Sequence, residues 1–352
     1  MWTENPIHLA DLREITANPN IPWGELEGKT IFVTGGTGLI GLNLINSILY
    51  YGQRVQNPPR VVALVRSEEK AKKLFARQLE QCGDSLRFVV GDVVNLPQLE
   101  MPIDYIIHGA SQTASAAFVA QPVETIETAL RGTRGLLELA REKQVRSLLY
   151  LSSMEAYGAP HEDVPLREEA GACFDSMSVR SCYPESKRMC ESLCAAYAAE
   201  YQVPAKVVRL AQTFGPGVVP TDARVFADFA RKAVQGQDIV MQTMGDSCRM
   251  YLYTMDAASA LLTILLKGEN GKCYNAANKD TYCSIREMAE LVSRVLSEGR
   301  SRVILPENTE RPAHFSPVHR LKLDTTRLEE LGWMPSCDLA QMYIRMAKGF
   351  SE

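Results

Sequence analysis

The sequence predicts an α/β protein built on a doubly wound parallel sheet, with a smaller α/β part toward the C-terminus. A glycine-rich turn joins an apolar run at 30–33 to a helical pattern at 39–49. Further apolar runs alternate with helical patterns up to residue 213, and such alternation implies parallel strands joined by right-handed crossovers. Beyond that residue the pattern changes to loops and shorter helices.

The composition is that of an ordinary globular protein, with 46% hydrophobic residues, 23% charged residues and a net charge of −4. A chain of 352 residues can bury a large core, in one large domain or two closely joined ones. This charge argues against a nucleic-acid-binding surface. Nine cysteines without a C-x-x-C pair favour a reduced, cytoplasmic protein without a metal. We find no signal peptide and no apolar run long enough to span a membrane, so no membrane partner is expected.

The first strand, turn and helix are predicted in Lys29–Asn43, KTIFVTGGTGLIGLN. Here Gly35 allows a sharp turn off the strand, Gly38 lets the backbone approach a pyrophosphate, and Gly41 lets the helix pack closely. The helix N-terminus adds unpaired N–H groups and the positive end of its dipole. A glycine-rich surface turn is the alternative, but the position between strand and helix favours a dinucleotide site of the Rossmann type. The residues expected to contact the dinucleotide are Gly35, Thr37, Gly38, Leu39, Ile40 and Gly41.

The second strand, Val61–Val65, leaves the identity of the dinucleotide open. Folds that bind NAD usually carry an acidic residue at the end of this strand, whereas an arginine suits the 2′-phosphate of NADP. Here the strand ends at Arg66, which is expected to contact the cofactor but could also be a solvated surface arginine. A helix is predicted over Glu68–Gln81.

The ends of the third and fourth strands carry further candidates for cofactor binding. Asp92 and Val93 follow the third strand, where a carboxylate can reach an adenine or ribose group, although it could equally cap a helix. The fourth strand, 104–110, runs into a loop of small residues beginning at Ala110, which allows a flat cofactor or sugar to approach the backbone. His108 is interpreted as a hydrogen-bonded strand-end histidine and not as a catalyst.

The remaining elements complete the predicted organisation. Strands are predicted at 86–90, 147–152 and 205–210, and helices at 122–143 and 183–201. In the second part, helices are expected at 223–235, 256–267 and 285–297, and segments 272–276 and 302–305 could be strands of the main sheet or of a small one. We expect an N-terminal extension at 1–28 with a short helix at 10–17, a dinucleotide-binding domain at 29–213 and a substrate-binding domain at 214–352, interleaved with the sheet.

Candidate catalytic residues follow the fifth strand, at Ser153, and open the next helix, at Tyr183 and Lys187. Tyr183 and Lys187 are four residues apart and therefore share one face of the helix. An ammonium beside a phenol is expected to lower the pKa of Tyr183 from about 10 toward neutrality, and a bound nicotinamide cation acts in the same direction. Tyr183 could then act as a general base toward a sugar hydroxyl that Ser153 holds. Alone, Y-x-x-x-K could be an ordinary helix face; behind a glycine-rich nucleotide turn it favours catalysis.

Taken together, TGGTGLIG, LSSMEAYG and YPESK resemble the extended short-chain dehydrogenase/reductase family of nucleotide-sugar epimerases, dehydratases and decarboxylases, over about residues 29–335. Within that family the chain is most similar to UDP-glucuronate decarboxylase (UDP-xylose synthase), in PVETIETALRG, RSCYPESKR and DARV and at Arg249. The resemblance implies a tightly held NAD that is reduced and reoxidised within one turnover. It also implies a homodimer joined through the helices at 122–143 and 183–201.

The resemblance assigns roles to the residues of these motifs. Ser153, Tyr183 and Lys187 match the catalytic serine or threonine, tyrosine and lysine, and Glu155 matches the glutamate of decarboxylases and 4,6-dehydratases. Met154 stands where dehydratases carry an aspartic acid that protonates the departing hydroxyl. Because methionine cannot donate a proton, dehydration by that route is disfavoured.

The substrate contacts that the resemblance implies are Ser115, Gln212, Arg224 and Arg249. The two arginines match residues that hold the nucleotide and diphosphate, a task that suits the guanidinium fork, although they could also be solvated surface residues. Gln212 stands where the family has asparagine, and Phe214 replaces a tyrosine. The change at Gln212 leaves the exact sugar nucleotide open.

The expected function is therefore NAD-dependent oxidation of a nucleotide sugar at C4, as in UDP-glucuronate decarboxylase. A 4-keto group turns the carboxylate of a uronic acid into that of a β-keto acid, which loses CO2 readily. A 4-epimerase, a 4,6-dehydratase or a net NADP-dependent keto-sugar reductase, which Arg66 favours, are the alternatives. A binding module that lost the chemistry is a further one, against which the intact Ser153, Tyr183 and Lys187 argue.

Overall fold

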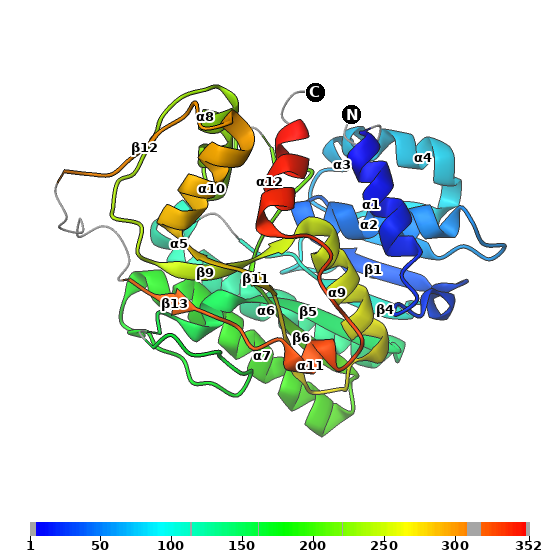
Figure 1. Cartoon of the computed structure of the whole chain (residues 1–352). Helices are drawn as coiled ribbons and strands as arrows, with labels where there is room; N and C mark the ends of the chain where they lie inside the picture. Colours follow the sequence, from blue (N-terminus) through cyan, green and yellow to red (C-terminus); the bar gives the residue numbers. More distant parts are fainter. Residues whose placement is uncertain (1–4, 113–114, 161, 220, 308–317, 350–352) are drawn as a thin grey trace.

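The centre of the molecule is a parallel sheet of seven strands in the order β10-β6-β5-β4-β1-β2-β3 (Figure 1). The computed structural model describes residues 5–112, 115–160, 162–219, 221–307 and 318–349, and leaves the side chains of 115–117 undescribed. The strands are β1 (Thr30–Thr34), β2 (Arg60–Val65), β3 (Leu86–Val90), β4 (Tyr105–His108), β5 (Ser147–Ser153), β6 (Ala205–Leu210) and β10 (Cys273–Ala276). All neighbouring pairs are parallel, which confirms the predicted doubly wound sheet.

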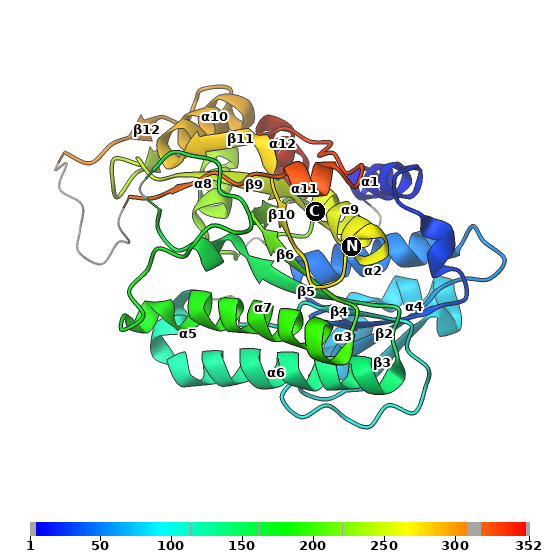
Figure 2. The same ribbon diagram turned by 90° about the horizontal axis from the view of Figure 1, so that it is seen from below.

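Helices cover both faces of this sheet, as Figure 2 shows. One face carries α2 (Leu39–Gly52) and α9 (Thr254–Lys267), and the other carries α6 (Pro122–Lys143) and α7 (Cys182–Tyr201). Successive residues of a strand point to opposite faces, so Ile31 and Val33 belong to one apolar core and Phe32 to the other. None of the helices in the described part of the chain is both long and apolar enough to span a bilayer.

The N-terminal segment lies against this body, as expected. Its helix α1 (Pro6–Thr16) begins earlier than predicted, because Asn5 accepts from the N–H of Ile7 and a proline occupies the first turn. Buried Asp11 fixes α1 to the C-terminal part: it accepts from the hydroxyl of Tyr253 at 2.5 Å and from Arg345 at 2.6 Å.

The C-terminal part forms two small sheets beside the carboxyl ends of the main strands. One contains β7 (Gln212–Phe214), β9 (Cys248–Tyr253), β11 (Asn278–Ser284) and β13 (Arg320–Leu321), and the other pairs β8 (Ile239–Val240) with β12 (Val303–Ile304). Its helices are α8 (Val225–Val234), α10 (Ile285–Ser297), α11 (Thr326–Glu329) and α12 (Leu339–Lys348). Segment 272–276 thus returns to the edge of the main sheet, as β10, whereas 302–305 falls in a small one. The division into domains stays a prediction.

One predicted helix is wrong in its continuity. The segment 68–81 is broken into α3 (Glu68–Leu74) and α4 (Ala76–Cys82). At the junction, Phe75 leaves helical geometry (φ −106°, ψ 20°) and its fully buried ring packs against Phe88. The helix is thus interrupted at Phe75, where the ring of this residue is buried against the sheet.

Candidate active site

A cleft of ≈ 1610 Å³ opens at the carboxyl ends of the parallel strands. Open α/β sheets bind ligands at this edge. Pockets for one drug-sized ligand measure about 300–1,000 Å³, so this cleft has room for a dinucleotide and a second large ligand. The predicted site residues that line it are Gly35, Thr37, Gly38, Leu39, Ile40, Gly41, Arg66, Asp92, Val93, Ala110, Ser153, Glu155, Tyr183, Lys187, Gln212, Arg224 and Arg249. Ser115 lies in α5 (Ser115–Ala120), and its side chain is outside the described part.

The glycine turn between β1 and α2 fits a pyrophosphate. Gly35 has φ +76°, and a Cβ there would lie 2.5 Å from the carbonyl carbon of Gly109. A Cβ at Gly41 would lie 2.3 Å from the carbonyl oxygen of Gly35. At Gly38 the nearest atom to such a Cβ would be that same oxygen, at 3.3 Å. Packing within the protein therefore leaves more room for a side chain at Gly38 than at Gly35 or Gly41. Gly38 is also the N-cap of α2 without a side-chain cap, which leaves first-turn N–H groups for an anionic ligand.

Two further residues that the sequence predicts to contact the cofactor follow neighbouring strands and line the cleft. Arg66 directly follows β2, and its side chain is exposed. Asp92 follows β3, and its Oδ1 accepts from the N–H of Val94 at 2.9 Å. Asp92 therefore stabilises its own turn while lining the cleft.

His108 has the structural role that the sequence predicts. Its Nδ1 lies 2.8 Å from Oγ1 of Thr34, and its Nε2 lies 3.2 Å from Oγ1 of Thr133. Burial lowers the pKa of His108 to about 3, so the ring stays neutral. Both ring nitrogens are occupied within the core, and no proton of this ring is available to a substrate.

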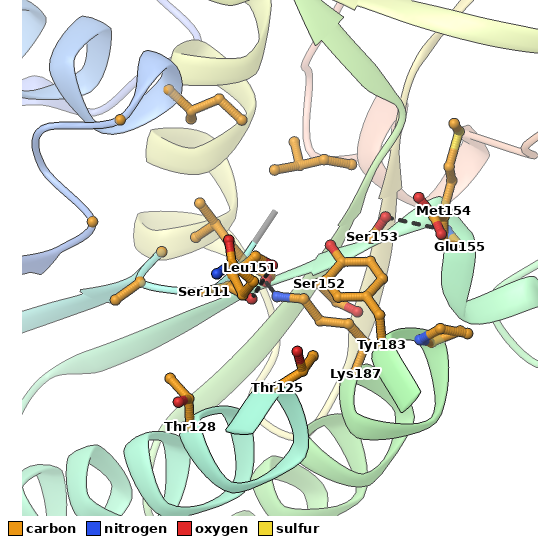
Figure 3. A pocket seen from close by; sticks show the side chains of 18 of the residues that line it. Ser111, Thr125, Thr128, Leu151, Ser152, Ser153, Met154, Glu155, Tyr183 and Lys187 are labelled. Carbon is orange, nitrogen blue, oxygen red and sulfur yellow. Dashed lines mark hydrogen bonds between the residues drawn. The ribbon is translucent and has the colours of Figure 1, made fainter. Parts of the chain in front are cut away.

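The candidate catalytic residues come together at one point of the cleft (Figure 3). Ser153 ends β5, and Tyr183 and Lys187 project from the start of α7 toward it. The ammonium of Lys187 donates to the carbonyl of Leu151 at 2.7 Å and lies 5.7 Å from the centre of the Tyr183 ring. The spacing of four residues therefore places both side chains at the end of β5, as predicted.

The expected acidity of Tyr183 is wrong for the protein alone. Burial and the nearby Glu155 carboxylate raise the pKa of Tyr183, and the hydrogen bond to Ser153 and the charge of Arg180 offset only part of this rise. Burial also lowers the pKa of Lys187 to about 8, because a charged ammonium is costly away from water. In the protein alone, the neighbouring lysine therefore does not make this phenol acidic.

Arg180 is a residue of this site to which the sequence assigned no role. It donates to Oε2 of Glu155 at 2.7 Å, and both side chains are more than one third exposed in the cleft. Its guanidinium also lies 4.7 Å from the centre of the Phe118 ring, which stacks on Tyr183 at 4.3 Å. The sequence signal was its position three residues before Tyr183, but only the fold shows that Glu155 is its partner.

A buried ion pair holds α7 against the sheet. Arg209 on β6 donates to both carboxylate oxygens of Glu191, at 2.9 and 2.6 Å, and Ser152 donates to the same carboxylate at 2.5 Å. The side chains of Arg209 and Glu191 are only 6% and 11% exposed. This contact fixes the helix that carries Tyr183 against the strand that carries Ser153.

The far end of the cleft is formed by the C-terminal part. Arg249 on β9 donates to Oε1 of Gln212 at 3.3 Å, and its Nη2 lies 2.9 Å from Nε2 of His319, a cleft residue that the sequence did not suggest. The buried Nε of Arg249 has no hydrogen-bond partner within the described ranges. Arg224 is held by Asp222 through Nε and Nη2, at 3.0 and 2.5 Å. Two guanidinium groups held by neighbouring side chains thus line this end of the cleft, and the guanidinium fork suits paired phosphate oxygens.

Sequence relatives place this site in a family. The family model described as NAD dependent epimerase/dehydratase matches residues 31–277. UDP-glucuronic acid decarboxylase 1 of Xenopus tropicalis is 29% identical over 320 residues, which are 90% of this chain and 71% of the relative. UDP-glucuronic acid decarboxylase 2 of Arabidopsis thaliana is 28% identical over 334 residues, which are 94% of this chain and 71% of the relative.

Solved structures show the same fold. UDP-glucose 4-epimerase from Thermotoga maritima, solved with UDP-glucose, has a TM-score of 0.75 at 22% identity, covering 92% of this chain and 98% of that one. The dTDP-glucose 4,6-dehydratase of Streptomyces venezuelae, solved with NAD bound, has a TM-score of 0.74 at 22% identity, covering 91% and 96%. With the glycine cradle and the Ser153, Tyr183 and Lys187 cluster in one cleft, the chain belongs to the NAD dependent epimerase/dehydratase family.

Proposed function

We propose that this enzyme converts a nucleotide-linked uronic acid into the corresponding pentose with release of CO2, and that the uronic acid is UDP-glucuronate. The observation that carries the proposal is the cationic side chain of Arg180 in the cleft beside Tyr183. The relatives named UDP-glucuronic acid decarboxylase support it as well.

The chemistry begins at C4 of the sugar. Hydride removal from C4, and its later return, is what NAD supplies when bound in the glycine cradle. The positive charge that oxidised NAD would bring when bound lowers the pKa of Tyr183. The phenolate of Tyr183 would then take the proton of the C4 hydroxyl, while Ser153 holds that hydroxyl and Lys187 adds positive charge one helical turn away. Oxidation makes the neighbouring carboxylate that of a β-keto acid. The bond between C5 and the carboxyl carbon then breaks, its electrons form an enolate, CO2 leaves, and a proton from water adds at C5. Return of the hydride to C4 and of the Tyr183 proton to the C4 oxygen would complete the turnover.

The carboxylate of the substrate needs a cation close to Tyr183, because C5 is bonded to C4. Lys187 is committed to the carbonyl of Leu151, whereas Arg180 lines the cleft and affects the pKa of Tyr183 by its charge. Arg180 donates to Glu155 through Nη2, and a guanidinium can serve two carboxylates at once through its other N–H groups. We assign Arg180 to the substrate carboxylate.

The residue beside Ser153 favours decarboxylation over dehydration. Met154 is 5% exposed, lies in the short 3₁₀ helix after β5 and packs into the apolar core. A thioether carries no proton for a departing hydroxyl. Loss of CO2 needs no such acid, since the leaving group departs neutral.

We also propose that the chain forms a homodimer through α6 and α7. These two helices lie side by side (Figure 2), and apolar side chains remain exposed on both of them. Val123 is 68% exposed, Ile126 36% and Met189 53%. Sedimentation should show a dimer for the wild type and a monomer for Ile126→Glu combined with Met189→Glu.

Product analysis tests the proposed reaction. UDP-glucuronate labelled at its carboxyl carbon should yield labelled CO2 and UDP-xylose, and Tyr183→Phe should yield neither. Arg180→Gln should reduce turnover of UDP-glucuronate while leaving NAD binding unchanged. Arg188→Gln removes the same charge from α7, at a residue that does not line the cleft, and serves as the matched control. Conversion to the 4-epimer without CO2 would show the epimerase alternative instead, and no conversion would refute the proposal.

A further inference from the structure

The strand end that selects the dinucleotide carries a cation in place of an acid. β2 ends at Val65, Arg66 follows, and the carbonyl of Val65 accepts from the N–H of Gly91 at 3.0 Å. Arg66 therefore lies between the glycine cradle and the end of β3, and it lines the same cleft as Gly38. In dinucleotide folds this is the place at which the 2′-position of the adenosine ribose is recognised.

Arg66 is available to a ligand. No described residue forms an ion pair or a side-chain hydrogen bond with it, and its side chain is exposed. The nearest acid in the chain, Glu68, is paired with Lys72 at 2.8 Å. The next polar residue, Ser67, accepts from the N–H of Lys70 and caps its own helix. Glu68 and Ser67 thus interact with other residues of their own helix, and neither of them neutralises the guanidinium of Arg66.

The acid on the adjacent strand end is also engaged. Asp92 lines the cleft, but its Oδ1 accepts from the N–H of Val94. A carboxylate at the end of β2 would accept hydrogen bonds from both ribose hydroxyls and repel a 2′-phosphate. A guanidinium cannot accept a hydrogen bond, but its N–H groups match two phosphate oxygens. The charge and the donor pattern at Arg66 therefore both suit a phosphorylated ribose.

We propose that Arg66 makes this site a receptor for dinucleotides with a 2′-phosphate, so that the enzyme accepts NADP in addition to NAD. This inference concerns the cofactor site alone and does not depend on the identity of the sugar. It bears on the outcome of a turnover, because an enzyme that takes up NADPH from solution can also carry out net reduction of a keto sugar.

Binding of the adenosine end alone tests this proposal without any turnover. Isothermal titration of the full chain with 2′,5′-ADP and with 5′-ADP should show at least tenfold tighter binding of the 2′-phosphorylated probe. Arg66→Gln should remove that preference while binding of 5′-ADP stays the same, and Arg66→Asp should reverse it. Arg60→Gln, an exposed arginine at the opposite end of β2, removes the same charge and should leave the preference intact.

The proposal fails if the wild type binds 5′-ADP as tightly as 2′,5′-ADP, or if Arg66→Gln and Arg60→Gln weaken the phosphorylated probe equally. The same titrations with NAD and NADP test the proposal on the whole dinucleotide. Binding of NAD that is tenfold tighter than binding of NADP would likewise overturn it. Failure here leaves the proposed decarboxylation standing, because its own test measures CO2.

Discussion

Replacement of Arg209 by methionine tests how α7 is held in place. The variant leaves the carboxylate of Glu191 buried without the two hydrogen bonds at 2.9 and 2.6 Å. Breaking a buried ion pair by removing one partner costs about 3–5 kcal/mol, because the remaining charge stays away from water. Since whole domains are stable by about 5–15 kcal/mol, the loss should move the midpoint of urea unfolding far below that of the wild type.

Two further variants give this prediction its controls. The double variant Arg209→Met with Glu191→Leu removes both charges and should recover much of the lost stability. Arg286→Met breaks an exposed pair of similar length, 2.9 Å to Glu290 with both side chains 48% exposed, and should cost no more than about 0.5 kcal/mol. Equal effects of Arg209→Met and Arg286→Met, or a double variant as unstable as the sum of its singles, would refute the reasoning.

Three other results follow from the same geometry. Gly38→Ala should weaken NAD binding with little change in melting temperature, since its Cβ meets only one protein atom, at 3.3 Å; calorimetry of both properties checks it. Gly41→Ala places a Cβ 2.3 Å from a carbonyl oxygen, so it should lower stability by about 1–3 kcal/mol in urea unfolding; an unchanged midpoint would contradict this. The folded pKa of Lys187, about 8, lies below its ordinary 10.5, so the unfolded chain binds more protons between these values. The stability difference between wild type and Lys187→Met should therefore shift in favour of the wild type as pH rises from about 8 to 10.5.

Local signals predicted much of this fold. The bounds of α6 and α10 match the prediction at both ends, because each carries its own start signal: a proline in the first turn of α6, and Ser284 with Glu287 as a capping box for α10. The glycine turn and the Y-x-x-x-K spacing likewise predicted Gly35, Tyr183 and Lys187, since a strand–glycine–helix pattern and a four-residue spacing on one helix face can be read from a few neighbouring residues.

Features that depend on distant contacts escaped prediction. The break at Phe75 follows from packing of its ring on β3, which no local propensity reveals. The raised pKa of Tyr183 follows from burial, whereas the sequence shows only the neighbouring lysine. The pairing of Arg180 with Glu155 joins residues 25 positions apart, and the contact of His319 with Arg249 spans 70 positions. Such partners can be found only once the sheet has brought them together.

The central claim is that Tyr183 and Lys187 face a nicotinamide site and act on C4 of a nucleotide sugar. The most direct test mixes the NAD-loaded enzyme rapidly with UDP-glucuronate and follows the near-ultraviolet absorbance of reduced nicotinamide. We expect a transient rise for the wild type and none for Tyr183→Phe, whose dinucleotide content remains the same. A rise of equal size in Tyr183→Phe, or no rise in a wild type that nevertheless releases CO2, would contradict the account.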